Sequence, residues 1–149
     1  MKIAIGNDHG GVALKQHVAE YLAGKGYEVL NLGTDSTAST DYPIYAQRVA
    51  KCVLAGEADF GVLICGTGIG VSISANKIDG IRCALCSEPV SARLAREHNN
   101  ANIVAMGART IGPVMAEGIV DVFLNTAFEG GRHARRVDMY SRLETGEEL

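Results

Sequence analysis

The sequence has no excess of basic residues and no long apolar run. Lys and Arg number 14 against 17 Asp and Glu, which gives a formal net charge of -3 at pH 7. A chain with this balance offers no basic face for a phosphate backbone, so we expect no nucleic-acid partner. No apolar run is long enough to cross a bilayer, and the first strand pattern begins at Lys2, which leaves no room for a signal peptide. These absences predict a cytoplasmic protein with no membrane partner.

Three signatures of phosphate or cofactor sites are also missing. No Gly-Lys-Ser or Gly-Lys-Thr occurs, so a Walker A loop is not expected. A cysteine phosphatase would need Arg at the sixth place after its cysteine, and Val71 stands there after Cys65. A dinucleotide fingerprint would need Gly or Ala at this same position and would normally follow the first strand rather than the third.

The cysteines lack a disulfide pattern. Cys52 falls in a helical pattern, and Cys65, Cys83 and Cys86 fall in strand-like runs, unlike the loop-rich spacing of a small disulfide scaffold. Cys83 and Cys86 form a C-x-x-C, but inside a strand rather than at the start of a helix, which does not favour a redox or zinc site. We therefore expect free thiols.

The chain does contain short β-branched runs that alternate with helical patterns. Its 149 residues show no internal repeat and fit one domain, 1–149. Strands are predicted over residues 2–6, 28–32, 61–65, 82–86 and 103–106. Apolar stripes at helical spacing lie between them: Leu14, Val18, Tyr21 and Leu22; Ala46, Val49, Ala50, Val53 and Leu54; Met115, Ile119, Val122 and Phe123. Because the 61–65 run is apolar on both faces, we predict an α/β fold, a single Rossmann-like, doubly wound domain with a five-stranded parallel sheet flanked by helices and a C-terminal arm and helix.

Ligands of such sheets bind outside the carboxyl ends of the strands. Gly66-Thr67-Gly68-Ile69-Gly70 follows the third strand and opens a helix predicted over 71–77, so its backbone N–H groups would cradle an anion. The same glycines would also suit a tight turn that serves backbone geometry alone. Both interpretations stay open on these residues.

Three side chains are candidates at the same edge. Cys65 ends the third strand, where the helix N-terminus would favour a thiolate acting as nucleophile or base. Its alternative is an inert packing group, since cysteine is commonly buried. Asp8 and His9 follow the first strand and would stand on the same rim, unless Asp8 only caps the next helix and His9 is a solvated loop residue.

Two later segments also carry titratable groups. A predicted helix ends at His98-Asn99-Asn100, where a histidine suits the negative end of the helix dipole and an asparagine suits a left-handed cap. His98 is also a candidate for the second histidine of the rim. Arg132-His133-Ala134-Arg135-Arg136 follows a Gly130-Gly131 hinge and would grip a phosphate through its guanidinium groups. A solvated helix face explains the same charge run equally well.

The order of these segments resembles the ribose-5-phosphate isomerase B family, which also includes galactose-6-phosphate isomerase subunits. The resemblance runs nearly end to end and is carried by Asn7-Asp8-His9-Gly10-Gly11, Thr40-Asp41-Tyr42-Pro43, Ile64-Cys65-Gly66-Thr67-Gly68-Ile69-Gly70, Ala75-Asn76-Lys77, Gly80-Ile81-Arg82, Arg96-Glu97-His98-Asn99 and Glu129-Gly130-Gly131-Arg132-His133. No Glu occurs between Gly68 and Lys77, which places the chain with the members that use a cysteine base. Asn100 departs from the family, where many members have Asp.

The resemblance implies an aldose–ketose isomerisation through an enediolate, without metal or other cofactor. Cys65 would move the proton from carbon 2 to carbon 1, Thr67 would assist at the substrate oxygens, and the N–H groups of residues 66–70 would hold the enediolate. The remaining family roles are ring opening by His98 with help from Asp8, phosphate binding by His9, Arg109, Arg132 and Arg136, and contact of Asn99 with sugar oxygens.

The resemblance also implies the partners. The family forms homodimers, sometimes paired into tetramers, with active sites shared between subunits. Its small-molecule substrate here would be ribose 5-phosphate and ribulose 5-phosphate, or alternatively a six-carbon sugar phosphate such as allose 6-phosphate or galactose 6-phosphate. A function of another class, a non-catalytic phosphate- or nucleotide-sensing module, would use the same glycine-rich loop without needing the thiol.

Overall fold

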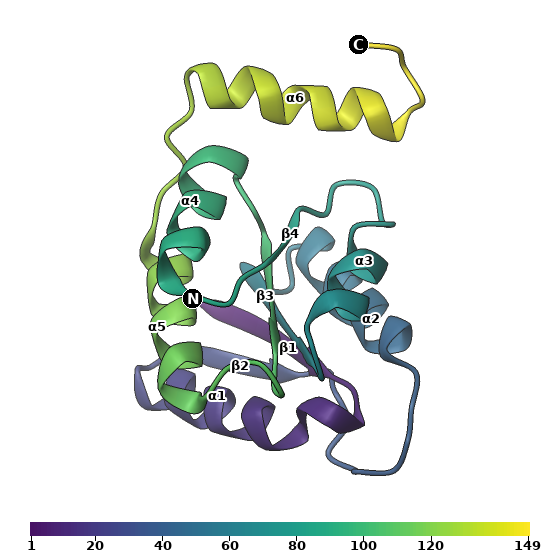
Figure 1. Cartoon of the computed structure of the whole chain (residues 1–149). Helices are drawn as coiled ribbons and strands as arrows, with labels where there is room; N and C mark the ends of the chain where they lie inside the picture. Colours follow the sequence, from purple (N-terminus) through teal and green to yellow (C-terminus); the bar gives the residue numbers. More distant parts are fainter.

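The computed structural model describes residues 1–149 and confirms the predicted α/β fold (Figure 1). Five parallel strands form one sheet in the order β2-β1-β3-β5-β4. The strands are β1 (Lys2–Asn7), β2 (Glu28–Asn31), β3 (Phe60–Cys65), β4 (Cys83–Leu85) and β5 (Ile103–Gly107). The helices are η1 (His9–Gly11, a 3-10 turn), α1 (Val12–Gly24), α2 (Tyr42–Leu54), α3 (Ile69–Ala75), α4 (Pro89–Asn99), α5 (Pro113–Asn125) and α6 (Arg132–Glu144). Every strand boundary lies within one residue of its prediction, whereas α3 begins two residues before the predicted 71–77.

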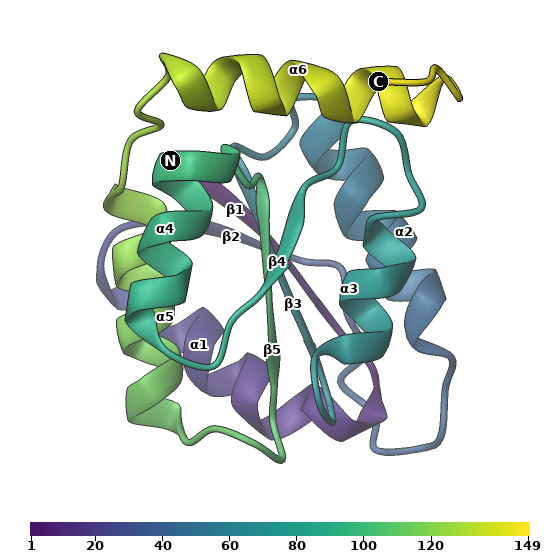
Figure 2. The same ribbon diagram turned by 45° about the horizontal axis from the view of Figure 1, so that its top comes forward.

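The sheet lies between two layers of helices (Figure 2). Helices α1, α4 and α5 cover one face, where β3 contributes Val62 and Ile64 to the core. Helices α2 and α3 cover the other face, where β3 contributes Leu63 and Cys65. Successive side chains of a strand point to opposite faces, so burial on both faces explains the continuous apolar run of β3.

Two residues of the predicted apolar stripes are exposed. Leu54 and Met115 are 48% and 41% exposed. Both lie in terminal turns, Leu54 at the end of α2 and Met115 near the start of α5. Ala116 and Val120 are buried in α5 instead, so the stripe of this helix is rotated relative to the prediction.

The ends of three strands meet at one edge of the sheet. The register pairs Asn7 with Ile64 and Cys65 with Gly107. β1 lies between β2 and β3, and the chain leaves β1 for α1 on one face and β3 for α3 on the other. This carboxyl edge is the switch point at which ligands bind in open parallel sheets.

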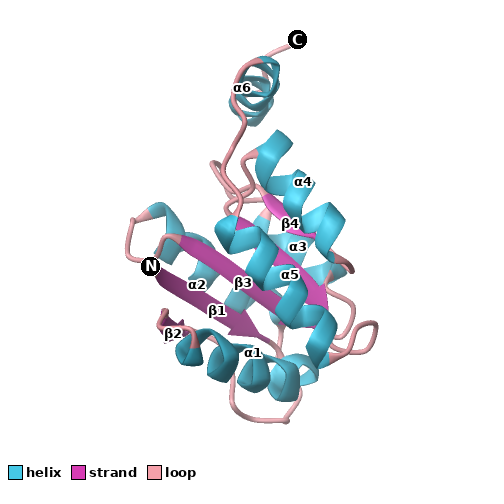
Figure 3. Ribbon diagram, turned by 90° about the vertical axis from the view of Figure 1, so that its left-hand side faces the viewer, coloured by secondary structure: helices cyan, strands magenta, loops and turns pink.

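Helix α6 lies across the opposite edge of the sheet, against the end of α4 (Figures 1 and 3). Gly130 and Gly131 precede it with φ values of 68° and 56°, a left-handed conformation that glycine adopts without a steric penalty. The predicted glycine hinge and C-terminal helix are thus confirmed. His133 is the buried residue of α6. None of the helices combines the length and apolar character of a membrane crossing.

Candidate active site

The loop after β1 presents a buried carboxylate at the carboxyl edge. Asp8 is 6% exposed, and its Oδ1 accepts a hydrogen bond from Gly10 N–H at 2.9 Å. The backbone N–H of Asp8 donates to the carbonyl of Ile64 at 3.3 Å, which ties this loop to the end of β3. Asp8 therefore caps η1, as one interpretation of the sequence held, and its second carboxylate oxygen makes no hydrogen bond within the chain.

His9 is held by the segment that leads into α2. Its Nδ1 accepts the N–H of Thr40 at 3.3 Å, so the neutral ring carries its proton on Nε2. Asn7 anchors the same 32–41 loop, since its Nδ2 donates to the carbonyl of Thr34 at 3.0 Å. His9 is thus a fixed donor of the rim rather than a freely solvated side chain.

Cys65 directs its sulfur into the glycine turn, which we define as residues 66–70. The residue is 4% exposed, and the N–H of Gly68 donates to Sγ at 3.1 Å. Gly68 has φ 78°, and a Cβ there would lie 2.8 Å from the carbonyl carbon of Met106, so only glycine lets the turn pass β5 so closely. The sulfur is therefore buried but faces a backbone hydrogen-bond donor of the turn.

The rest of the glycine turn offers polar groups and is covered on two sides. Thr67 is exposed and its Oγ1 accepts the N–H of Ile69 at 3.3 Å. Arg109 lies over Gly66, with its guanidinium carbon 3.4 Å from the position a Cβ would take. The ring of Tyr42 lies against Gly70 in the same way, at 2.6 Å. No role was predicted for Tyr42, although it belongs to one of the matching segments.

The structure brings together nine of the predicted site residues, four side chains and the five residues of the glycine turn. They are Asp8, His9, Cys65, Gly66, Thr67, Gly68, Ile69, Gly70 and Arg109. Gly10 connects the two loops, because a Cβ there would lie 3.3 Å from Asp8 Oδ1 and 3.4 Å from Gly66 N.

His98 does not stand on this rim, contrary to the expectation of a second rim histidine. Helix α4 starts beside the carboxyl end of β4 and runs back to the amino end of β5, so that His98 lies near Ala101 and Ile103. The step from Ile103 to Gly107 alone spans about 13 Å of strand. Asn99 ends α4, and Arg132 and Arg136 belong to α6, which crosses this amino edge, so within one chain all three are distant from Cys65.

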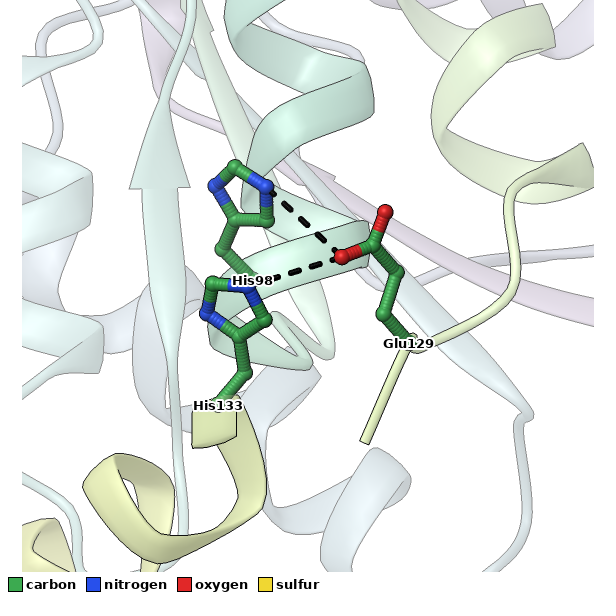
Figure 4. A group of neighbouring side chains, drawn as sticks. All are labelled: His98, Glu129 and His133. Atoms are coloured by element: carbon green, nitrogen blue, oxygen red, sulfur yellow. Dashed lines mark ion pairs between the residues drawn. The ribbon is translucent and has the colours of Figure 1, made fainter. Parts of the chain in front are cut away.

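At the amino edge, two imidazoles share one carboxylate (Figure 4). The rings of His98 and His133 are stacked with centroids 4.2 Å apart and an angle of 9° between planes. Glu129 Oε2 lies 3.9 Å from His98 Nε2 and 3.5 Å from His133 Nε2. Burial, with the nearby charges of His98 and Arg132, lowers the pKa of His133. Asn99 is held beside this group, since its Nδ2 donates to the hydroxyl of Tyr140 at 2.9 Å.

His98, Glu129 and His133 are the one group of side chains in the chain that could together bind a metal ion. Their ligand atoms lie within 4.8 Å of one another. However, the lone pairs of the two stacked rings lie in nearly parallel planes, whereas a metal ion needs lone pairs that converge on one point. One of the rings would have to rotate before both could bind the same metal ion. The geometry therefore fits a metal-free group of two imidazoles and one carboxylate better than it fits a metal site.

The other candidate features are structural. Asn100 has φ 46° and ψ 42°, the predicted left-handed cap of α4. The cysteines are all unpaired. Burial raises the pKa of Cys86 to about 11 and that of Cys83 still further, which keeps both thiols protonated and unreactive.

Comparison with known proteins relates this fold and rim to one family. The family model described as Ribose/Galactose Isomerase matches residues 3–140. Ribose-5-phosphate isomerase B of Escherichia coli (strain K12) is 50% identical over 143 residues, which cover 96% of each chain. The structure of ribose-5-phosphate isomerase B from Clostridium thermocellum has a TM-score of 0.97 at 50% identity, covering 98% of this chain and 99% of that one. D-erythrulose-4-phosphate isomerase of Pectobacterium atrosepticum is 41% identical over 145 residues, 97% of this chain and 95% of that protein.

The similarity covers both edges of the sheet, since it includes the glycine turn, the end of α4 and the start of α6. The named relatives are isomerases of different sugar phosphates. The chain therefore belongs to the ribose/galactose isomerase family of sugar phosphate isomerases.

Proposed function

We propose that this chain interconverts ribose 5-phosphate and ribulose 5-phosphate through an enediolate, with Cys65 as the base. The proposal is carried by the sulfur that faces the glycine turn, with Gly68 N–H donating to Sγ at 3.1 Å. This contact orients the sulfur beside the turn, and the N–H groups of Gly66, Thr67 and Gly70, which donate to no group of the chain, are available to an oxyanion there.

In the proposed reaction the thiolate takes the proton from C2 of the open-chain aldose. The C–H electron pair forms the C1–C2 double bond, and the carbonyl pair moves onto O1, which the backbone N–H groups of the glycine turn stabilise. The Cys65 thiol then returns its proton to C1, while the proton of O2 passes to O1 and leaves a C2 carbonyl. Thr67, whose hydroxyl is exposed beside the turn, assists this last transfer.

The substrate phosphate is bound by cationic and N–H donors. His9 offers Nε2–H because its Nδ1 is occupied by Thr40, and Arg109 lies over Gly66 at the same rim. Arg132 and Arg136 are exposed on the first turns of α6 and lack an acidic partner in the chain. Guanidinium groups match the oxygens of a phosphate, so these two are the proposed phosphate clamp.

The separation of the two edges supports a site shared with a second copy of the chain. We infer that a homodimer, alone or paired into a tetramer, places His98, Asn99, Arg132 and Arg136 of one copy over the rim of the other. His98 then opens the furanose ring with help from Asp8 of the facing copy, and Asn99 contacts the sugar oxygens. A shared site explains why a sugar-phosphate isomerase would keep a basic clamp and an imidazole so far from its thiol.

A six-carbon sugar phosphate is the alternative substrate, because the pocket that measures substrate length forms only between two copies. The ratio of kcat/KM for ribose 5-phosphate to that for allose 6-phosphate decides between them. We expect the ratio to exceed about 10, since one extra hydroxymethylene in a fitted pocket changes binding by about 1–3 kcal/mol. A ratio below 1 would replace the five-carbon proposal with the six-carbon one.

The competing proposal of another class is a phosphate- or nucleotide-sensing module built on the same turn. Purified protein mixed with ribose 5-phosphate distinguishes the two by ketose formation, followed by absorbance. Turnover supports the isomerase. Absence of ketose at micromolar protein, together with tight nucleotide binding by calorimetry, would support the sensor.

A further inference from the structure

The contact between α4 and the start of α6 joins His98 to two residues for which no role has been assigned, Glu129 and His133 (Figure 4). All three are distant from Cys65 in one chain, and two of them do not belong to the proposed reaction. The arrangement of Glu129 and His133 nevertheless bears on His98, because the carboxylate lies 3.9 Å from its Nε2 and the second imidazole is stacked on its ring.

We propose that Glu129 and His133 are positioning residues that fix the ring orientation and tautomer of His98 for opening the sugar ring. In this proposal the Glu129 carboxylate accepts a hydrogen bond from Nε2–H of His98. Nδ1 of His98 is then the nitrogen that exchanges a proton with the substrate. His133 is the flat surface against which the ring is held. The inference rests on the proposed function and adds residues to its ring-opening step.

The backbone places Glu129 where it can act on His98. Its N–H donates to the carbonyl of Glu97 at 3.0 Å, which fastens the segment before α6 to the last turn of α4. The carboxylate then faces Nε2 of His98 at 3.9 Å, longer than a hydrogen bond. Such contacts are often long without substrate and shorten in the complex. An ionised carboxylate accepts hydrogen bonds only, so it selects the tautomer with hydrogen on Nε2.

The burial of His133 makes it a rigid surface. It is 6% exposed, and its Nε2 has no hydrogen-bond partner, with Glu129 Oε2 the nearest acid at 3.5 Å. The groups that face it are His98 from α4, Glu129 from the preceding segment, and Arg132 and Arg136 from α6. Burial and these cations lower its pKa, so His133 stays neutral and does not oppose a proton on His98. The 4.2 Å stack prevents the His98 ring from turning over.

Substrates that have no ring provide the test. Erythrose 4-phosphate cannot form a furanose, because its phosphate occupies the oxygen that would close the ring, and a relative 41% identical to this chain is an isomerase of erythrulose 4-phosphate. Loss of positioning at His98 should therefore lower kcat for ribose 5-phosphate and spare turnover of erythrose 4-phosphate. A merely structural role would lower both.

The variants are Glu129→Gln and, as a matched control, Glu97→Gln. Glu97 is the neighbouring carboxylate on α4, but it pairs with Arg93 at 2.7 Å rather than with an imidazole. For Glu129→Gln we expect kcat on ribose 5-phosphate to fall about 10- to 100-fold, with turnover of erythrose 4-phosphate within about twofold of wild type. Glu97→Gln should leave both unchanged. His133→Phe, which keeps a flat ring, should retain more activity on ribose 5-phosphate than His133→Ala.

A second measurement needs no turnover. Nitrogen-15 NMR of the imidazoles should report His98 with hydrogen on Nε2 in the wild type and a mixture of tautomers in Glu129→Gln. Equal losses on both sugars, no loss on either, or an unchanged His98 tautomer in Glu129→Gln would overturn the inference. A wild-type protein inactive on ribose 5-phosphate would instead contradict the proposed function, and the inference with it, so the two failures are distinguishable.

Discussion

Replacing Gly68 by Ala should impair catalysis and destabilise the fold together, because this glycine carries the N–H that faces Cys65. Gly68 has φ 78°, where any residue with a Cβ is strained by about 1–2 kcal/mol. The added Cβ would also lie 2.8 Å from the carbonyl carbon of Met106 and 2.5 Å from Leu85 Cδ1. Leu85 can move, but the backbone of β5 cannot, so the turn must shift at a further cost of about 1–3 kcal/mol.

The shift also moves the N–H that donates to Cys65 Sγ. The neighbouring N–H groups proposed to hold the enediolate belong to the same turn and move with it, and loss of one oxyanion donor costs about 100- to 1000-fold in kcat. We therefore expect Gly68→Ala to lower the free energy of unfolding, measured in urea, by about 2–5 kcal/mol. Its kcat for ribose 5-phosphate should fall by at least about 100-fold.

Gly26→Ala is the matched control for backbone strain. Gly26 has φ 86° in the turn between α1 and β2, and a Cβ there would meet nothing within 4 Å. This variant should lose about 1–2 kcal/mol of stability and keep its kcat. The reasoning would be refuted if Gly68→Ala kept a kcat within about threefold of wild type, or if Gly26→Ala lost as much activity.

Three further predictions concern the assembly, the pH dependence of stability and the thiols. Mixing Cys65→Ala with His98→Asn should restore about a quarter of wild-type activity, because only one site of each mixed dimer is intact; no recovery after subunit exchange would show that the sites are not shared. Hydrogen bonds from Lys15 and Asn31 hold the pKa of Asp35 below its usual value, so this carboxylate stabilises the fold above about pH 4 and the effect is lost on further acidification. Urea midpoints measured from pH 6 to pH 2 should therefore fall more steeply for wild type than for Asp35→Asn, and parallel curves would contradict this. Iodoacetamide at pH 8 should modify Cys65 before Cys52, Cys83 and Cys86, because burial raises the pKa of these last three thiols. Peptide mass mapping gives the order of modification, and finding Cys83 modified first would contradict the prediction.

The sheet and the glycine turn were predictable because local patterns determine them. The apolar run of β3 ends at Cys65, and the glycines that follow can only form a turn, so the sulfur and the backbone donors are adjacent in sequence as well as in space. Asp8 and His9 follow the neighbouring strand, and parallel strands bring their carboxyl ends together.

The position of His98 at the amino edge also follows from the sequence. A helix that follows one parallel strand and precedes the next runs back to the amino edge, so a histidine at its end cannot lie on the carboxyl rim. The sequence did predict that His98 closes a helix. The prediction of a second rim histidine is therefore wrong within one chain, whereas the expectation of active sites shared between subunits stays a prediction.

Contacts between distant segments could not be predicted. The ring of Tyr42 over Gly70 depends on how α2 packs against α3, and the stack of His98 on His133 depends on how the glycine hinge turns α6 back towards α4. The burial of Lys15 beside Asp35 has the same origin, since it depends on the path of the loop after β2. Neither spacing nor composition carries this information.

The most direct test of the proposed mechanism is ketose formation from ribose 5-phosphate by Cys65→Ala, measured beside the wild type with a chelator present. The account predicts that the wild type is fully active under these conditions. The variant should bind the sugar phosphate and yet turn over at least about 1000-fold more slowly, because the group that carries the proton between carbons is gone. A variant within about tenfold of wild type would mean that another group is the base.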